Sequence, residues 1–149
     1  MSQISKINEE NVVIFLSLTG NARKFANFAA EVLECRAISF SNIQGINCQN
    51  LLIVTGTYML SNMWWLLKTP FITTQNLATC SLFSISKGVA QRAKFFFKSH
   101  VKHENYYDHY IEVGYFPLLY WTKDKPYSED YIRFKKWLLG FKHFCEQQN

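Results

Sequence analysis

Short apolar runs alternate with helix-spaced apolar positions along most of the chain, and this alternation predicts its elements. Apolar runs of roughly four to eight residues, bounded by turn-forming residues, are typical of buried strands. The run from Leu51 to Thr55 is continuously apolar, as expected of a strand that is covered on both faces. The sequence predicts five strands, at residues 12–16, 36–40, 51–55, 79–85 and 115–121.

Three stretches carry apolar residues at the spacing of an amphipathic helix. The first follows the first strand and ends near Glu34, and the second ends near Val101. The third begins at Ser128, a residue type that caps helices, with Glu129 and Asp130 suited to the positive end of the helix dipole. The predicted buried faces are Phe25, Phe28, Ala29 and Val32; then Val89, Ala93, Phe96, Phe97 and Val101; then Tyr131, Phe134, Leu138, Phe141 and Cys145.

The connections between these elements are less regular. Residues 34–62 leave little room for a full crossover helix between the second and third strands, so we expect a loop there, with residues 41–50 polar. A short helix at 62–68 is stopped by Pro70. Residues 1–10 are expected to be a flexible lead-in, and residues 105–112 fit either strand or helix.

The alternation of strands and helices predicts one domain over residues 1–149, a parallel sheet with helices on both sides. In such a sheet, ligands bind outside the carboxyl ends of the strands. The turns after the first, third and fourth strands therefore form the expected site.

Composition narrows the function classes. No apolar run approaches the roughly 18 residues that cross a bilayer, and the polar start lacks a signal-peptide core, so we expect a cytoplasmic protein. The net charge is +5, and the segment from Lys87 to Lys102 has basic residues but no acidic one. That segment could bind an acidic protein. Because the sequence has no nucleic-acid recognition motif, we favour a solvent-exposed helix face over nucleic-acid binding.

Other chemistry-bearing residues suggest no catalytic centre. The four cysteines have neither metal-ligand nor redox spacing, and buried or free thiols are expected. His100 and His103 could share a helix face near His109, with Glu104 or Asp108 as a further metal ligand. Solvent-exposed histidines are the preferred interpretation of this cluster.

The most specific motif is the turn after the first strand, Ser17-Leu18-Thr19-Gly20-Asn21. A strand that turns directly into a helix leaves the first helical N–H groups without partners, and these donors suit a phosphate or carboxylate. Gly20 allows close backbone approach, and the neighbouring hydroxyl and amide side chains add donors. Ordinary helix capping explains the same residues about equally well.

This turn resembles the Ser/Thr-x-Thr-Gly-Asn phosphate loop of flavodoxins. Arg23-Lys24-Phe25 resembles the form that the loop takes in NrdI, the flavodoxin of class Ib ribonucleotide reductase. The segments 115–120 and 128–130 also resemble NrdI, and the order of elements fits over most of the chain. The resemblance implies a three-layer flavodoxin-like fold with a five-stranded parallel sheet in the order 2-1-3-4-5.

The resemblance also implies FMN as cofactor and a redox accessory protein rather than an enzyme with its own substrate. In NrdI the reduced flavin supplies an oxidant from O₂ for assembly of the dimanganese-tyrosyl radical cofactor of the reductase small subunit. The partner implied is therefore that subunit, and a general flavodoxin that shuttles electrons is the alternative. The cofactor-binding residues implied are Ser17, Leu18, Thr19, Gly20, Asn21 and Ala22 for the phosphate, and Thr57, Tyr58, Met59, Trp64, Ser84, Ser86 and Gly88 for the ring.

Two of the three flavin loops depart from the NrdI pattern. Met59, Leu60 and Ser61 stand where NrdI has a Gly-rich stretch, and after the fourth strand only Gly88 is comparable. The bulky residues Trp64 and Trp65 could fill the ring site themselves or contact a protein. A flavin-free interaction module with the same fold is therefore the competing hypothesis.

Overall fold

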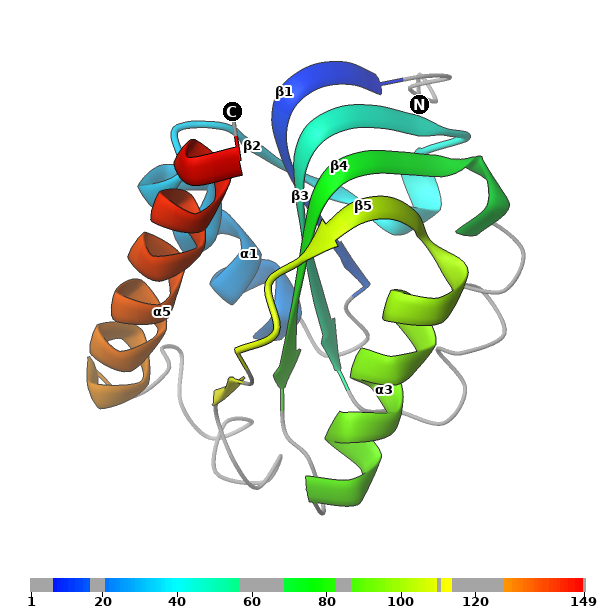
Figure 1. Ribbon diagram of the computed structural model, residues 1–149. Helices are drawn as coiled ribbons and strands as arrows, with labels where there is room; N and C mark the ends of the chain where they lie inside the picture. Colours follow the sequence, from blue (N-terminus) through cyan, green and yellow to red (C-terminus); the bar gives the residue numbers. More distant parts are fainter. Residues whose placement is uncertain are drawn as a thin grey trace.

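Parallel strands form the centre of the molecule, and helices lie against both of their faces (Figure 1). The computed structural model describes residues 7–16, 21–56, 69–82, 87–109, 111–113 and 128–148. The strands are β1 (Ile7–Leu16), β2 (Arg36–Ser39), β3 (Ile46–Gly56), β4 (Ile72–Leu82), β5 (Lys102–Tyr106) and β6 (Glu112–Val113). The helices are α1 (Asn21–Val32), α3 (Lys87–His100) and α5 (Ser128–Gln148), with 3-10 turns η1 (Phe40–Asn42) and η2 (Thr69–Phe71).

The strand order is β2-β1-β3-β4-β5, and every pair is parallel. This order confirms the predicted fold class. The short strand β6 also runs parallel to β4, at Ser81 and Leu82, beyond the last residue of β4 that pairs with β5. The edge of the sheet is therefore made by β5 and then by β6.

Two apolar cores lie on opposite faces of the sheet. On one face, α1 and α5 pack against Val13, Phe15, Leu52 and Val54. On the other face, Phe97 of α3 packs with residues that include Ile14, Leu51 and Ile53. Alternate residues of the central strands thus serve both cores, because successive strand side chains point to opposite faces. This explains the unbroken apolar run predicted for the third strand.

Helices α1 and α5 bury their predicted faces, and on the described part of α3 Phe97 is buried. Phe25 and Ala29 of α1 are fully buried, while Phe28 and Val32 pack at the margin of the same core. Phe134, Leu138, Phe141 and Cys145 of α5 are buried, and Tyr131 is half-buried. The α1 and α5 faces meet through aromatic rings: Phe25 lies 5.6 Å from Phe134 edge-on, and Phe28 lies 4.7 Å from Tyr131.

Three strands are longer than predicted, because each extends at its amino end through polar residues. β1 begins at Ile7, so residues 7–10 are not a flexible lead-in. β3 begins at Ile46, within the segment predicted as a polar loop, and β4 begins at Ile72. Apolar runs locate only the part of a strand that both cores cover; the polar extensions lack that signal.

The last described strands of the sheet lie earlier in the chain than the predicted strand at 115–121. The strand that pairs with β4 on the side away from β3 is Lys102–Tyr106, followed by Glu112–Val113, and only parts of these two strands fall within the segment 105–112 that the sequence left ambiguous. β5 is half-buried or exposed along its length, so it lacks an apolar run. The predicted strand at 115–121 lies outside the described residues, as does the short helix at 62–68. Between β2 and β3, the 3-10 turn η1 stands in place of a crossover helix, as expected.

A bend crosses four strands at one level and changes which face their side chains meet. In β3, Cys48 and Leu51 belong to the same core, so the two residues between them, Gln49 and Asn50, break the alternation. The pairing skips Gln49 and resumes at Asn50 with unchanged register. Because every strand has the same irregularity, the sheet bends without a register shift, toward the side that carries α3 (Figure 1).

Four asparagines hold this bend together. Asn11, Asn50, Asn76 and Asn105 occupy paired positions on β1, β3, β4 and β5. Asn105 Nδ2 donates to Asn76 Oδ1 at 3.1 Å, Asn76 Nδ2 to Asn50 Oδ1 at 2.7 Å, and Asn50 Nδ2 to Asn11 Oδ1 at 2.7 Å. We call this chain of hydrogen bonds the asparagine ladder. It satisfies amides that are otherwise removed from water, Asn76 completely so.

Candidate functional site

The carboxyl ends of β1, β3 and β4 meet at one edge of the sheet. Leu16, the last residue of β1, pairs with Thr55, and Gly56, the last residue of β3, pairs with Leu82, the last residue of β4. The chain leaves β1 toward β2 on one side and β3 toward β4 on the other, so the strand order reverses between β1 and β3. This reversal marks the expected ligand position in an open parallel sheet.

The phosphate motif connects this edge to a helix start. Only residues 17–20 separate the end of β1 from Asn21, the first residue of α1. Asn21 and the buried Ala22 are therefore placed at the helix N-terminus, where free N–H groups and the helix dipole favour an anion. Ser17, Leu18, Thr19 and Gly20 lie outside the described residues.

The first turn of α1 has an unfavourable charge arrangement for an isolated helix. It carries Arg23 and Lys24 and no acidic residue. Cations near the positive end of a helix dipole cost stability, whereas an anion there is stabilising. Capping alone gives no reason for two cations at this position, and a bound phosphate would offset their cost. The residues of this helix start thus fit the phosphate end of FMN.

The ring-binding residues are largely beyond what the structure describes. Thr57, Tyr58, Met59, Trp64, Ser84 and Ser86 lie outside the described residues, so their placement stays a prediction. Gly88 was predicted in the turn after the fourth strand, but it is the second residue of α3, which begins at Lys87. The connection after β4 is therefore residues 83–86, as short as the connection that precedes α1.

The basic segment from Lys87 to Lys102 is partly neutralised. Its helical part is α3, and Lys94 and Lys98 both form ion pairs with Asp108, which follows β5. The hydrogen bond from Lys94 lowers the pKa of Asp108 below its usual value. Lys102 lies on β5 instead of the helix, so these charges do not form a single helix face.

The histidines do not share a helix face. His100 is the last residue of α3, and its Nδ1 lies 2.8 Å from the carbonyl oxygen of Phe96. His103 is on β5, with Nε2 donating to the carbonyl oxygen of Lys98 at 2.9 Å. The chain turns from helix to strand between them, which the spacing alone did not reveal.

All four cysteines are free thiols, as predicted, and Cys48, Cys80 and Cys145 are buried. Burial raises the pKa of Cys48 to about 11 and, with a contribution from Glu9, that of Cys35 to about 11. Burial also raises the pKa of Cys80 strongly. Because the thiolate is the reactive form, these thiols are not poised for redox chemistry.

The raised thiol pKa values predict a loss of stability at alkaline pH. Unfolded thiols ionise near 9.0, whereas folded Cys35 and Cys48 keep their protons to about 11. Unfolding therefore releases protons above pH 9, and rising pH favours the unfolded state through this window. Urea unfolding at about pH 8 and about pH 10 should show the lower free energy at the higher pH. Cys48→Ala should weaken this dependence; a free energy that is the same at both pH values would contradict it.

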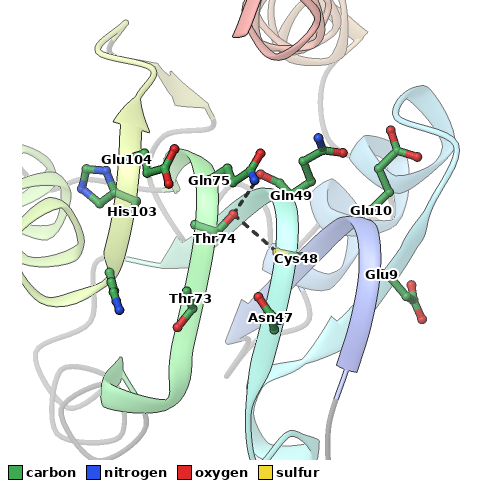
Figure 2. A pocket seen from close by; sticks show the side chains of 11 residues that line it. Glu9, Glu10, Asn47, Cys48, Gln49, Thr73, Thr74, Gln75, His103 and Glu104 are labelled. Atoms are coloured by element: carbon green, nitrogen blue, oxygen red, sulfur yellow. Dashed lines mark hydrogen bonds between the residues drawn. The ribbon is translucent and has the colours of Figure 1, made fainter. Parts of the chain in front are cut away.

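At the opposite, amino edge of the sheet, the structure shows a polar site that the sequence did not predict. Glu10, Gln49, Gln75 and Glu104 come from four adjacent strands and line one pocket of about 590 Å³ (Figure 2). In the sequence each of these residues directly precedes an asparagine, and the four pairs lie far apart along the chain. Their neighbourhood could have been predicted only from the register of the strands, with the polar amino-terminal extensions correctly paired.

Comparison with solved structures identifies the fold. A flavodoxin from the domain Archaea has 14% sequence identity and a TM-score of 0.61, over 92% of this chain and 99% of its own. The flavodiiron core of Flv1 from Synechocystis sp. PCC6803 has 13% identity and a TM-score of 0.62, over 99% of this chain but 38% of its own. No protein-family model matches the sequence, and a search of curated proteins gives no match.

The helices in the described part of the chain are too short or too polar to cross a membrane. The strand order, the helices on both faces and the two structural neighbours agree on the architecture. The chain therefore has a flavodoxin-like fold.

Proposed function

We propose that the protein binds FMN at the carboxyl edge of the sheet and serves as an NrdI-like electron carrier. The observation that carries this proposal is the start of α1. The Thr19-Gly20-Asn21 unit runs directly into that helix, whose first turn has two cations and no acid to balance the dipole. The flavodoxin-like fold supports FMN as the ligand that brings the phosphate.

Each part of the protein has a defined task in this proposal. The backbone N–H groups at the start of α1 bind the phosphate, and Arg23 and Lys24 add positive potential. The chain segments that follow β3 and β4 hold the ring, since both strands end beside β1. FMN, when bound, supplies the redox chemistry, and the protein positions it and adjusts the charge around it.

The charge at the start of α1 gives a test that separates phosphate binding from capping. We expect Asn21→Asp to weaken FMN binding by about tenfold or more, because a carboxylate would stand where the phosphate binds. The same change should raise the stability of the flavin-free protein by about 0.5 kcal/mol, since an acid suits a helix N-terminus. Absorbance and fluorescence titrations with FMN, beside urea unfolding without it, measure both effects.

Two controls make this test specific. Asn27→Asp introduces the same charge at an exposed position further along α1, and it should change FMN affinity by less than about twofold. Riboflavin, which lacks the phosphate, should bind wild type and Asn21→Asp about equally. Equal loss of riboflavin and FMN affinity in Asn21→Asp would contradict a phosphate site at this helix. If wild type binds no FMN at tens of micromolar, the flavin-free interaction module becomes the better hypothesis.

The NrdI-like role needs a separate experiment. The Arg23-Lys24-Phe25 sequence after the motif supports this role over a general electron shuttle. We expect the reduced, FMN-loaded protein to activate a manganese-loaded small subunit of a class Ib ribonucleotide reductase in the presence of O₂. Rapid reduction by a flavodoxin reductase without such activation would support the shuttle instead. Docking of an acidic partner on the basic residues between Lys87 and Lys102 would weaken as salt is added.

A further inference from the structure

A polar pocket lies at the amino edge of the sheet, opposite the edge where FMN is proposed to bind. The bend turns one face of the strand extensions outward, and that face carries rows of polar side chains that are exposed except for the half-buried Gln49. Asn47 and Thr73 belong to one row and Gln49 and Gln75 to the next, each pair on adjacent strands (Figure 2). Parallel sheets normally cover both faces with apolar contacts, so an exposed polar face on such a sheet is unusual.

The backbone beneath the glutamine row is held in place. The Thr74 hydroxyl lies 3.0 Å from the carbonyl oxygen of Asn76 and 3.2 Å from that of Gln49, and it accepts the Cys48 thiol at 3.5 Å. The asparagine ladder crosses the sheet one residue after the glutamine row. The positions of Gln49 and Gln75 are thus fixed by buried contacts, which lowers the entropy cost of using them to bind a ligand.

The chemistry of the pocket excludes several ligand classes. Its lining is dominated by amides, hydroxyls and charged groups, so it offers little to an apolar ligand. Glu10 and Glu104 stand at the two ends of the glutamine row and disfavour anions. Glu9, Glu10 and Glu104 could accept from a polyamine, but Lys102 would repel it and the amide N–H groups would find no acceptor on it. A neutral polyhydroxyl ligand matches the mixture, since each hydroxyl both donates and accepts.

An exposed aromatic ring stands beside these rows. A neighbouring pocket of about 530 Å³ shares Asn47 and Thr73 with the first and is also lined by Phe71. The Phe71 side chain is 61% exposed, which is high for an aromatic residue. An aromatic face beside planar amides is the combination that binds sugars, whose C–H faces stack on rings while their hydroxyls bond to amides.

We propose that this amino-edge pocket binds a linear oligosaccharide. Gln75 and Thr73 lie two residues apart on β4, and Phe71 directly precedes that strand, so a linear chain that runs along β4 would meet all three. The hydroxyls bond to Gln49, Gln75 and Thr73, and one sugar ring stacks on Phe71. The site is independent of FMN, because the two ligands lie at opposite ends of the strands.

Cellotriose is a suitable probe, added to the uniformly ¹⁵N-labelled full chain and followed by NMR. We expect saturable shifts of the Gln49, Gln75 and Thr73 signals at about 10 mM sugar or below, a range typical of weak recognition. Gln75→Ala should weaken binding by about five- to tenfold, the loss of one or two hydrogen bonds. Phe71→Ala should weaken it similarly. Gln148→Ala, the same change at an exposed position near the end of α5, should leave it unchanged.

Other outcomes overturn the proposal. If cellotriose causes no shifts of the signals from this pocket, the proposal is wrong. Equal binding of cellotriose by wild type and Gln75→Ala would also contradict it. Stronger shifts of the same signals with spermidine or inorganic phosphate would assign the pocket to a different ligand class. FMN titration of Gln75→Ala should match wild type, so that a failure at this pocket and a failure of the flavin proposal can be told apart.

Discussion

Asn76→Asp is expected to destabilise the protein by about 2–4 kcal/mol at pH 7, a large part of the stability of a domain of this size. Asn76 is fully buried, and its amide both donates and accepts within the asparagine ladder. A carboxylate cannot donate to Asn50. The neighbouring amides could turn to offer their N–H groups, but the buried charge would still have left water.

The pH dependence identifies the cause. Burial raises the pKa of an aspartate at this position above its unfolded value of about 3.9, so its protonated form is favoured in the folded state. Below the unfolded pKa the carboxyl is protonated in both states, and the free energy of unfolding of the variant is then at its highest. This stability is lost as the pH rises through the folded pKa, because the unfolded state then releases its proton more readily. Urea midpoints of Asn76→Asp relative to wild type should therefore fall between about pH 4 and pH 7.

The matched control is Asn27→Asp, which makes the same change at an exposed position of α1. It should alter the free energy of unfolding by less than about 0.5 kcal/mol at either pH. An equal loss at pH 4 and pH 7 for Asn76→Asp would show that shape, and not charge, matters at the centre of the ladder.

Phe134→Ala is expected to cost about 3–5 kcal/mol, the range for removing a fully buried aromatic side chain. Phe134 has no exposed surface and joins α5 to α1 through ring contacts at 5.6 Å with Phe25 and 6.1 Å with Phe28. Its ring also stacks on Trp137 at 6.0 Å. The change removes both apolar burial and these ring contacts, and it leaves a cavity between the helices.

Ile132→Ala provides the comparison on the same helix. Ile132 is 71% exposed, so its truncation should cost less than about 0.5 kcal/mol. Urea unfolding of both variants measures the difference directly. Similar losses for the two would mean that α5 is not held to α1 mainly by its inner face.

The covered part of the fold follows from the sequence, since apolar burial leaves a periodic signal. Leu51 to Thr55 reads as a strand because both of its faces meet a core, and the Phe25 and Phe134 faces read as helices because only one side is buried. The helix start at Asn21 could also be located, since the residue types around it mark a helix N-terminus that suits an anion. Those signals are local, and the strand order and the edge where FMN is proposed to bind were predicted only with the resemblance to flavodoxins.

The polar half of the sheet was decided by tertiary structure. Asn11, Asn50, Asn76 and Asn105 look like turn or surface residues in the sequence, and only the register makes them partners across four strands. The edge strand at Lys102–Tyr106 has no apolar run; its position is set by pairing with β4. The amino-edge pocket depends on both, because hydrogen bonding between strands carries no periodic signal along any one of them. The sequence by itself therefore determined the cores and the start of the first helix, while register and bend, which arise only when strands pair, created the amino-edge pocket.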